Sequence, residues 1–215
     1  MAKLIYASNM SLDGYTETAD GAFDWAPPDD EVFASITEIM RSAGTYLYGR
    51  RMYETLAVWE TDPTLAALSD LTADYASAWQ AADKIVYSTT LAAADTSATS
   101  ATPAAPATPA APATPAAPAT PVAPSTANTR LERRFDPDAV RDLKAAAGRD
   151  LLIGGPNLAA QALATGLVDE LALFVWPVLL GGRNRALPTD TRADLELIEE
   201  RRFSSGVMHL RYRVQ

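Results

Sequence analysis

Stretches with strand patterning and stretches with helix patterning alternate along most of this sequence, and that order leaves few fold classes open. In 29–43 apolar residues recur at the spacing of one helix face, whereas 170–176 is a near-continuous apolar run of strand length. Such alternation predicts an α/β fold with a mixed, mainly parallel sheet and helices on both faces. Two last strand stretches, joined by Ser204-Ser205-Gly206, predict an antiparallel C-terminal hairpin.

The remaining boundaries follow from the same patterns. The sheet should hold about eight strands, at 3–8, 45–48, 84–88, 129–135, 151–153, 170–176, 195–203 and 207–214. Helices are predicted at 29–43, from 50 onward, at 65–82, at 136–147 and from 157 to 164, with a turn-rich segment at 9–21. Gly44 is expected to stop the first helix, and Leu68 is expected on the buried face of the helix 65–82.

Residues 98–126 consist almost entirely of Ala, Pro, Thr and Ser, and 102–125 read TPAAPA, TPAAPA, TPAAPA, TPVAPS. The prolines of each unit prevent both a helix and a strand ladder, and alanine methyl groups offer little surface to bury. We therefore expect an exposed polyproline-II-like or disordered loop inserted in a single domain that spans 1–215. Its removal should change stability by roughly 1 kcal/mol or less.

Composition excludes several classes of function. The chain has no Cys and a single His, which argues against disulfides, thiolate chemistry and the usual metal sites. A net charge of −9 is a poor match for nucleic acid, and any anionic ligand needs a locally positive site. No apolar run approaches the ~20 residues of a membrane span, and the start MAKLIYAS lacks a leader pattern. We expect a cytoplasmic protein without membrane or nucleic-acid partners.

Two glycine-containing segments follow predicted strands and open predicted helices. Free backbone N–H groups point outward at such a junction, and the guanidinium groups of Arg50 and Arg51 after Gly49 add donors for a phosphate. The alternative is a solvated basic helix start. Gly154-Gly155 would let a pyrophosphate approach the backbone closely. This segment matches neither GxGxxG nor a Walker loop, and the alternative is a tight turn that binds no ligand.

A third segment carries three carboxylates, Asp29, Asp30 and Glu31, at the start of the first helix. Their default role is to complement the helix dipole. A carboxyl group held against Trp25 could instead have a raised pKa and serve as a proton source. His209 lies in the middle of a predicted strand and is expected to be an exposed hairpin side chain rather than a catalytic group.

Taken in order along the chain, these segments resemble the reductase domain of riboflavin biosynthesis, a relative of dihydrofolate reductase. The resemblance covers nearly the whole chain except the repeat, and GLVDEL followed by a strand and PVLLGG is its most specific part. It rests on KLIYASNMSLDGY, WAPPDDE, LYGRRMYET, VYSTT, LLIGGPNLAAQAL, GLVDELALFVWPVLLGG and ERRFSSGVMHLRYRV.

The resemblance implies a dihydrofolate-reductase-like fold, NADPH as cofactor and a homodimer with contacts from 171–176 and the final hairpin. Residues 7–14 would flank the nicotinamide, and Asp30 would line the substrate pocket as the catalytic acid. The implied cofactor-binding residues are Gly49, Arg50, Arg51, Ser88, Thr89, Gly154, Gly155 and Asn157.

One departure limits what the resemblance implies. The bifunctional riboflavin enzyme carries a zinc deaminase domain whose signature needs cysteines, and this chain has none. We therefore expect a stand-alone NADPH-dependent reductase of a small heterocyclic substrate, either pteridine-like or a ribosylaminopyrimidine. The alternatives are a reductase with another cofactor, such as a deazaflavin, and a nucleotide-binding protein without turnover.

Overall fold

The computed structural model describes residues 1–91 and 126–215. The predicted repeat loop 98–126 lies outside these residues except at its last position. There Thr126 is buried, with its hydroxyl 3.1 Å from the Tyr53 hydroxyl and 2.6 Å from that of Thr129. Thr126 therefore packs against the fold, although the sequence assigned it to the predicted loop.

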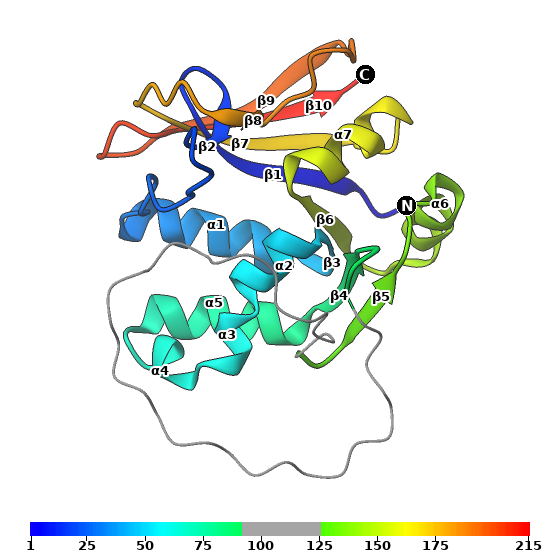
Figure 1. The fold of residues 1–215 in the computed structure, drawn as a ribbon, viewed down its shortest axis with the longest axis horizontal. Coiled ribbons are helices and arrows are strands. Elements are labelled where there is room, and N and C mark those ends of the chain that lie inside the picture. Colours follow the sequence, from blue (N-terminus) through cyan, green and yellow to red (C-terminus); the bar gives the residue numbers. More distant parts are fainter. Residues whose placement is uncertain (92–125) are drawn as a thin grey trace.

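The strands of the described residues are β1 (Leu4–Ser11), β2 (Tyr15–Glu17), β3 (Ala43–Gly49), β4 (Asp83–Tyr87), β5 (Thr129–Glu132), β6 (Asp150–Gly154), β7 (Glu170–Trp176), β8 (Arg183–Arg185), β9 (Leu195–Arg202) and β10 (Met208–Val214). Eight of them form one sheet in the order β5-β4-β3-β6-β1-β7-β10-β9 (Figure 1). The strands from β5 to β7 are parallel, and β10 is antiparallel to both of its neighbours. The predicted mainly parallel sheet with a C-terminal hairpin is confirmed.

The helices are α1 (Asp30–Ser42), α2 (Arg50–Leu56), α3 (Val58–Thr61), α4 (Pro63–Ala66), α5 (Asp70–Ala81), α6 (Pro137–Ala146) and α7 (Pro156–Ala164). Helices α1, α2 and α5 contribute to the core on one face of the sheet, and α6 and α7 cover the other (Figure 1). Within the described part of the chain, no helix has both the length and the apolar character to cross a membrane.

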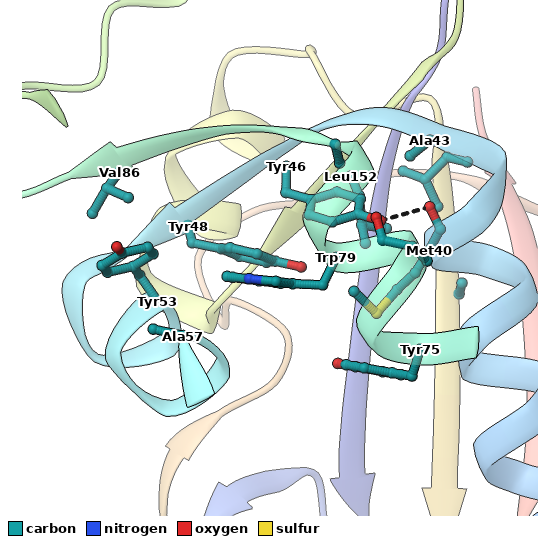
Figure 2. Packing of buried hydrophobic residues seen from close by; sticks show 14 of the residues in the cluster. Met40, Ala43, Tyr46, Tyr48, Tyr53, Ala57, Tyr75, Trp79, Val86 and Leu152 are labelled. Carbon is teal, nitrogen blue, oxygen red and sulfur yellow. Dashed lines mark hydrogen bonds between the residues drawn. The ribbon is translucent and has the colours of Figure 1, made fainter. Parts of the chain in front are cut away.

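Aromatic side chains fill the core beneath α2. The ring of Trp79 stacks on that of Tyr48 at a centroid distance of 5.8 Å, and Tyr46 and Tyr53 lie beside this pair (Figure 2). The Tyr46 hydroxyl donates a hydrogen bond to the carbonyl of Met40 at 2.9 Å (Figure 2). This packing fixes the end of β3 and the first turn of α2 relative to α1 and α5.

Two predicted helix boundaries are wrong, and each has a local cause. Helix α1 ends at Ser42, and Gly44 lies inside β3 because the extended backbone of Ala43 already pairs in register with Asp150 of β6. The predicted helix 65–82 is broken, since Ser69 forms a capping box and starts α5 afresh. Leu68, expected to face inward, is 71% exposed in the connection.

The segment 9–21, read as a turn, includes the end of β1 and the whole of β2. Strand β2 pairs with β8, and these two short polar strands form a separate antiparallel ribbon. Tyr15 lies opposite Arg185 and Glu17 opposite Arg183 in this ribbon. The pairing joins parts of the chain that sequence patterning could not connect.

His209 is buried, so its predicted exposure is wrong. Its exposed fraction is 3%, and its ring stacks on Phe174 at 4.6 Å between centroids. Strand β10 lies between β7 and β9 rather than at the edge of the sheet, which explains the burial. Neither ring nitrogen has a hydrogen-bond partner in the described part of the chain, and desolvation lowers the pKa of the imidazole.

Candidate functional site

The connections after β1 and β6 leave the sheet on opposite faces. The chain after β1 passes through α1 to β3, whereas the chain after β6 passes through α7 to β7, although β1 and β6 are neighbours. Open parallel sheets bind ligands at such a point, beyond the carboxyl ends of the strands. We call the carboxyl ends of β1, β3, β4 and β6 the carboxyl edge, and the opposite ends of the strands the amino edge.

The two predicted phosphate-binding segments meet at the carboxyl edge. Helix α2 begins directly after β3, and α7 begins one residue after the neighbouring strand β6. Met52 of α2 lies between them: a Cβ atom at Gly154 would be 3.4 Å from its Cε, and one at Gly155 would be 4.0 Å from its Cβ. The starts of both helices therefore face the same edge.

The glycines at these junctions have different physical roles. Gly155 has a φ of +91°, a conformation that favours glycine, at the N-cap of α7. Gly154 is required by packing, because a Cβ atom there would lie 2.6 Å from Cε1 of Tyr48. At Gly49 a Cβ atom would meet nothing within 4 Å, so the space above the end of β3 is open. Asn157 is exposed in the first turn of α7.

Arg50 faces the turn that follows β4. One of its guanidinium nitrogens donates to the hydroxyl of Thr90 at 3.1 Å. The Ser88 hydroxyl accepts from the backbone N–H groups of Thr90 and Leu91, so this predicted ligand group already holds its own turn. Arg133 donates to the carbonyl oxygen of Ser88 at 3.2 Å. Two arginines thus flank the 88–91 turn, and Arg133 had no motif that could have revealed it.

Arg51 is occupied by a contact with Glu17. One guanidinium nitrogen lies 3.1 Å from the carboxylate of Glu17, whose side chain is only 5% exposed. The same guanidinium lies over the ring of Phe23, 4.9 Å from its centroid. Arg50 and Arg51, equivalent in the sequence, therefore have different surroundings: Arg51, 49% exposed, pairs with the buried Glu17 and anchors the segment after β1, whereas Arg50, 37% exposed, lies beside the 88–91 turn.

Glu17 joins three segments that are distant in the sequence. Besides Arg51, its carboxylate accepts from Asn184 Nδ2 at 2.9 Å and from Arg183 Nε at 3.3 Å. Gly182 allows the close approach, since a Cβ atom there would lie 1.9 Å from the Glu17 carbonyl oxygen. This cluster was missed from the sequence, because an isolated Glu in a polar segment gives no signal of burial.

The three carboxylates at the start of α1 differ in their contacts. Asp29 is the N-cap and accepts from the N–H of Val32 at 2.8 Å, which lowers the pKa of its carboxyl group. Glu31 accepts from the N–H and the hydroxyl of Ser204, at 3.0 and 2.8 Å, and these bonds lower its pKa as well. Asp30 is exposed, and its side chain contacts no partner within residues 1–91 and 126–215.

The segment 7–14, predicted to flank a nicotinamide, is held at its far end by Asp13. Its carboxylate accepts from the hydroxyl of Ser11 at 2.6 Å and from the N–H groups of Leu180 and Gly181 at 3.1 and 2.8 Å. These hydrogen bonds, with the one from Ser11 as the largest cause, lower the pKa of Asp13 to about 2. Asp13 therefore positions the loop after β1 against the segment after β7.

Two shallow depressions elsewhere lack the features of the carboxyl edge. One of about 420 Å³ lies between α4 and α5 and is lined by alanines, Ser77 and Gln80. The other, of about 360 Å³, lies beside Thr45 and Asp83 at the amino ends of β3 and β4. Neither receives the start of a helix. The described residues contain no group of three or more side chains suited to hold a metal ion.

Fold and candidate site together define an α/β domain whose candidate ligand edge lies where the connections of the sheet diverge. The chain belongs to the RibD C-terminal domain family, whose sequence model matches residues 2–209. It is 26% identical, over 98% of its length and 94% of the relative, to the uncharacterised protein YyaP of Bacillus subtilis strain 168.

Solved structures share the fold at low identity. A proposed riboflavin biosynthesis protein from Shewanella sp. PV-4 has a TM-score of 0.68 at 18% identity, covering 100% of this chain and 99% of that one. A pyrimidine reductase-like protein from Corynebacterium diphtheriae has a TM-score of 0.57 at 12% identity, with 100% and 92% covered.

A bifunctional deaminase and 5-amino-6-(5-phosphoribosylamino)uracil reductase from Thermotoga maritima has a TM-score of 0.60 at 12% identity. The match covers 100% of this chain but 57% of the Thermotoga protein. The family membership and the fold inferred from the sequence motifs are confirmed.

Proposed function

We propose that this chain is an NADPH-dependent reductase of a small heterocyclic substrate, either pteridine-like or a ribosylaminopyrimidine such as 5-amino-6-(5-phosphoribosylamino)uracil. The observation that carries the proposal is the convergence of two helix starts and a partly exposed arginine at one edge of a reductase-type fold. NADPH bound there would supply the hydride, and the protein would place and shield the reacting groups.

Residues at the carboxyl edge fit the phosphates of such a cofactor. Arg50 is 37% exposed and its nearest carboxylate, Glu54, is 3.6 Å away, an exposed pair that costs little to break. We assign the 2′-phosphate to Arg50 and to the exposed Thr89 in the adjacent turn. The pyrophosphate is assigned to the start of α7, where Gly155 and Asn157 leave backbone N–H groups accessible.

Arg51 receives a different role in this proposal. Its guanidinium pairs with the buried carboxylate of Glu17, together with that of Arg183, and covers Phe23, so losing this contact would be costly. We assign Arg51 to holding the segment 15–23 beside the carboxyl edge rather than to binding phosphate.

Asp30 is the proposed proton source. Hydride addition to a C=N bond leaves a nitrogen that must be protonated. Asp29 and Glu31 are held by the helix N-terminus and by Ser204, whereas Asp30 has an uncommitted carboxyl group in the same turn. The arrangement supports Asp30 as the carboxyl group able to reach a substrate.

The proposed activity is tested by incubating the protein with NADPH and a panel of pterins and ribosylaminopyrimidines. The loss of NADPH absorbance measures its oxidation. Turnover of at least one ring, with NADPH preferred to NADH, is the expected result. Tight NADPH binding without turnover of any ring would favour a nucleotide-binding protein. Turnover with a reduced deazaflavin but not with NADPH would reassign the cofactor.

We also propose that the chain forms a homodimer through its final hairpin. Strand β9 is exposed along almost its whole length, and Leu195 and Leu197 on it are 42% and 46% exposed. An edge strand with exposed leucines offers both apolar surface and unpaired backbone groups. Strand β7, included in the predicted contact region, is buried between β1 and β10. A monomer in sedimentation at micromolar concentration would contradict the dimer.

A further inference from the structure

Asn9 is exposed although it lies in a central strand. Strand β1 runs between β6 and β7, but its pairing with β6 stops at Tyr6, whereas its pairing with β7 continues to Ser11. Ala7 still packs against the core beneath α1, and Asn9 is the next residue on the same face. The core therefore ends between these two positions, and the side chain of Asn9 is open to a ligand at the carboxyl edge.

The orientation of the Asn9 amide is fixed by chemistry. The indole nitrogen of Trp176 lies 3.1 Å from Asn9 Oδ1. An indole N–H can only donate, so the atom that faces it must be the carbonyl oxygen of the amide. The amide nitrogen, with two donor hydrogens, then points away from Trp176, and no acceptor for it occurs in the described residues.

Two indole rings stand beside this amide. Trp25 contacts Trp176 edge to face, with centroids 6.2 Å apart and an angle of 77°. The Trp25 indole nitrogen donates to the carbonyl of Thr16 at 3.1 Å, which fixes the ring against β2. Trp176 is buried, whereas Trp25 is partly exposed. The accessible ring of Trp25, near a directed donor, suits a flat heterocycle that carries an acceptor on its rim.

We propose that Asn9 determines substrate specificity by donating a hydrogen bond from its amide nitrogen to a carbonyl oxygen of a uracil-type or lactam-type ring. The inference rests on the proposed reductase function and narrows its substrate class. Trp176 is the positioning residue, because its N–H holds the amide in the donating orientation. A ring with an amino group in place of that carbonyl would set donor against donor and bind poorly.

A matched pair of rings tests this role. The probes are 6-aminouracil and 2,4,6-triaminopyrimidine, compared at a pH where both are neutral, and binding is followed by NMR through the Asn9 side-chain amide and Trp indole signals. Wild-type protein should bind 6-aminouracil at least about tenfold more tightly. Asn9→Asp keeps the acceptor for Trp176 but replaces the donor by an acceptor, and should reverse the preference.

Two further variants separate specificity from folding. Trp176→Phe removes the N–H that orients the amide and should bring the two affinities to within about twofold of each other. Ser77→Ala is the control, since Ser77 lies on α5 beside the depression between α4 and α5, away from the carboxyl edge, and should leave the preference unchanged. Thermal unfolding of each variant verifies that the fold is kept.

The outcomes distinguish the inference from the proposed function. If Asn9→Asp still prefers 6-aminouracil as the wild-type protein does, the inference alone is overturned. It is also overturned if this variant changes NADP⁺ affinity without changing the preference between the two rings. If wild-type protein binds neither ring and reduces no heterocycle, the proposed function and the inference fail together.

Discussion

Two buried carboxylates, one at the amino edge of the eight-stranded sheet and one beside its carboxyl edge, serve different purposes. At the amino edge Glu170 accepts from Lys3, which directly precedes β1, at 2.6 Å and from Arg211 of β10 at 2.7 Å. At the carboxyl edge Glu17 accepts from Arg51 and Arg183, which lie on α2 and β8. The first cluster ties strands together, and the second ties a segment beside the ligand edge to the helix start.

Other charged side chains at the two edges also differ in whether they have partners within the fold. At the amino edge the buried Lys144 is paired with Asp169 at 2.6 Å, so these two charges are used within the fold. At the carboxyl edge Asp30 has no partner in the described part of the chain, and Arg50 has only an exposed one. Charges that the fold does not use are the ones available to a ligand, which is why we place function at the carboxyl edge.

The largest effect is expected for Asp30→Asn. Because Asp29 already caps α1, the loss of the Asp30 carboxylate should leave thermal stability nearly unchanged. An amide cannot donate the proton, so turnover should fall by ~10²-fold or more at constant NADPH affinity. Steady-state kinetics from pH 5 to 8 measure this effect, with Asp29→Asn as the matched control. Wild-type turnover across that range would remove the catalytic role.

Glu170→Gln should affect stability alone. Replacing this carboxylate weakens charge-assisted bonds from Lys3 and Arg211, and about 1.5–3 kcal/mol of unfolding free energy should be lost. The control is Glu196→Gln, which breaks an exposed pair with Arg213 and should cost about 1 kcal/mol or less. Urea unfolding measures both. A Glu170 variant as stable as the control, or one with altered NADPH affinity, would break the distinction between the two edges.

Arg50→Ala should weaken NADPH binding at least about tenfold and leave NADH binding nearly unchanged, because the lost contact is with the 2′-phosphate. Arg51→Ala is the comparison: it removes one of the two arginines paired with the buried Glu17 and should lower stability while the ratio of NADPH to NADH affinity is kept. Calorimetric titration of both cofactors provides the measurement. If Arg51→Ala alone removes the discrimination, the assignment of the two arginines must be exchanged.

The smallest effect concerns acid stability. Desolvation lowers the pKa of His209 in the folded state, so the unfolded chain binds a proton more readily, and stability is lost as the pH falls below about 6.5. Glu199 opposes this shift, and Arg201 and Arg211 add to it. His209→Phe should flatten the pH dependence while keeping the stack on Phe174. An unchanged slope of unfolding free energy below that pH would show that His209 is not its source.

Local signals accounted for most of the fold. The apolar run Glu170–Trp176 became β7 to the residue, and Asp136 caps α6 as predicted, because burial and capping depend on neighbours in sequence. The predicted limit between the first helix and β3 was late by one to two residues, because Ala43 already pairs with β6. The β2–β8 ribbon could not be seen, since both strands are three residues long and polar.

The site was predictable only in part, because the roles of its residues depend on contacts between distant parts of the sequence. Sequence motifs indicated that Gly49, Arg50 and Gly154 follow strands, and the sheet brings these junctions together. They could not separate Arg50 from Arg51, because that difference depends on Glu17, which lies 34 residues away from Arg51. The burial of His209 likewise depends on the position of β10 inside the sheet.

The most direct test of the account is a map of the NADPH-binding surface by amide NMR. Perturbed signals should cluster at 49–52, 88–91 and 154–158, at the carboxyl edge, while those of Lys3, Asp169 and Glu170 at the amino edge stay unchanged. Perturbations centred on the amino edge, or none at saturating NADPH, would contradict the assignment of the ligand edge.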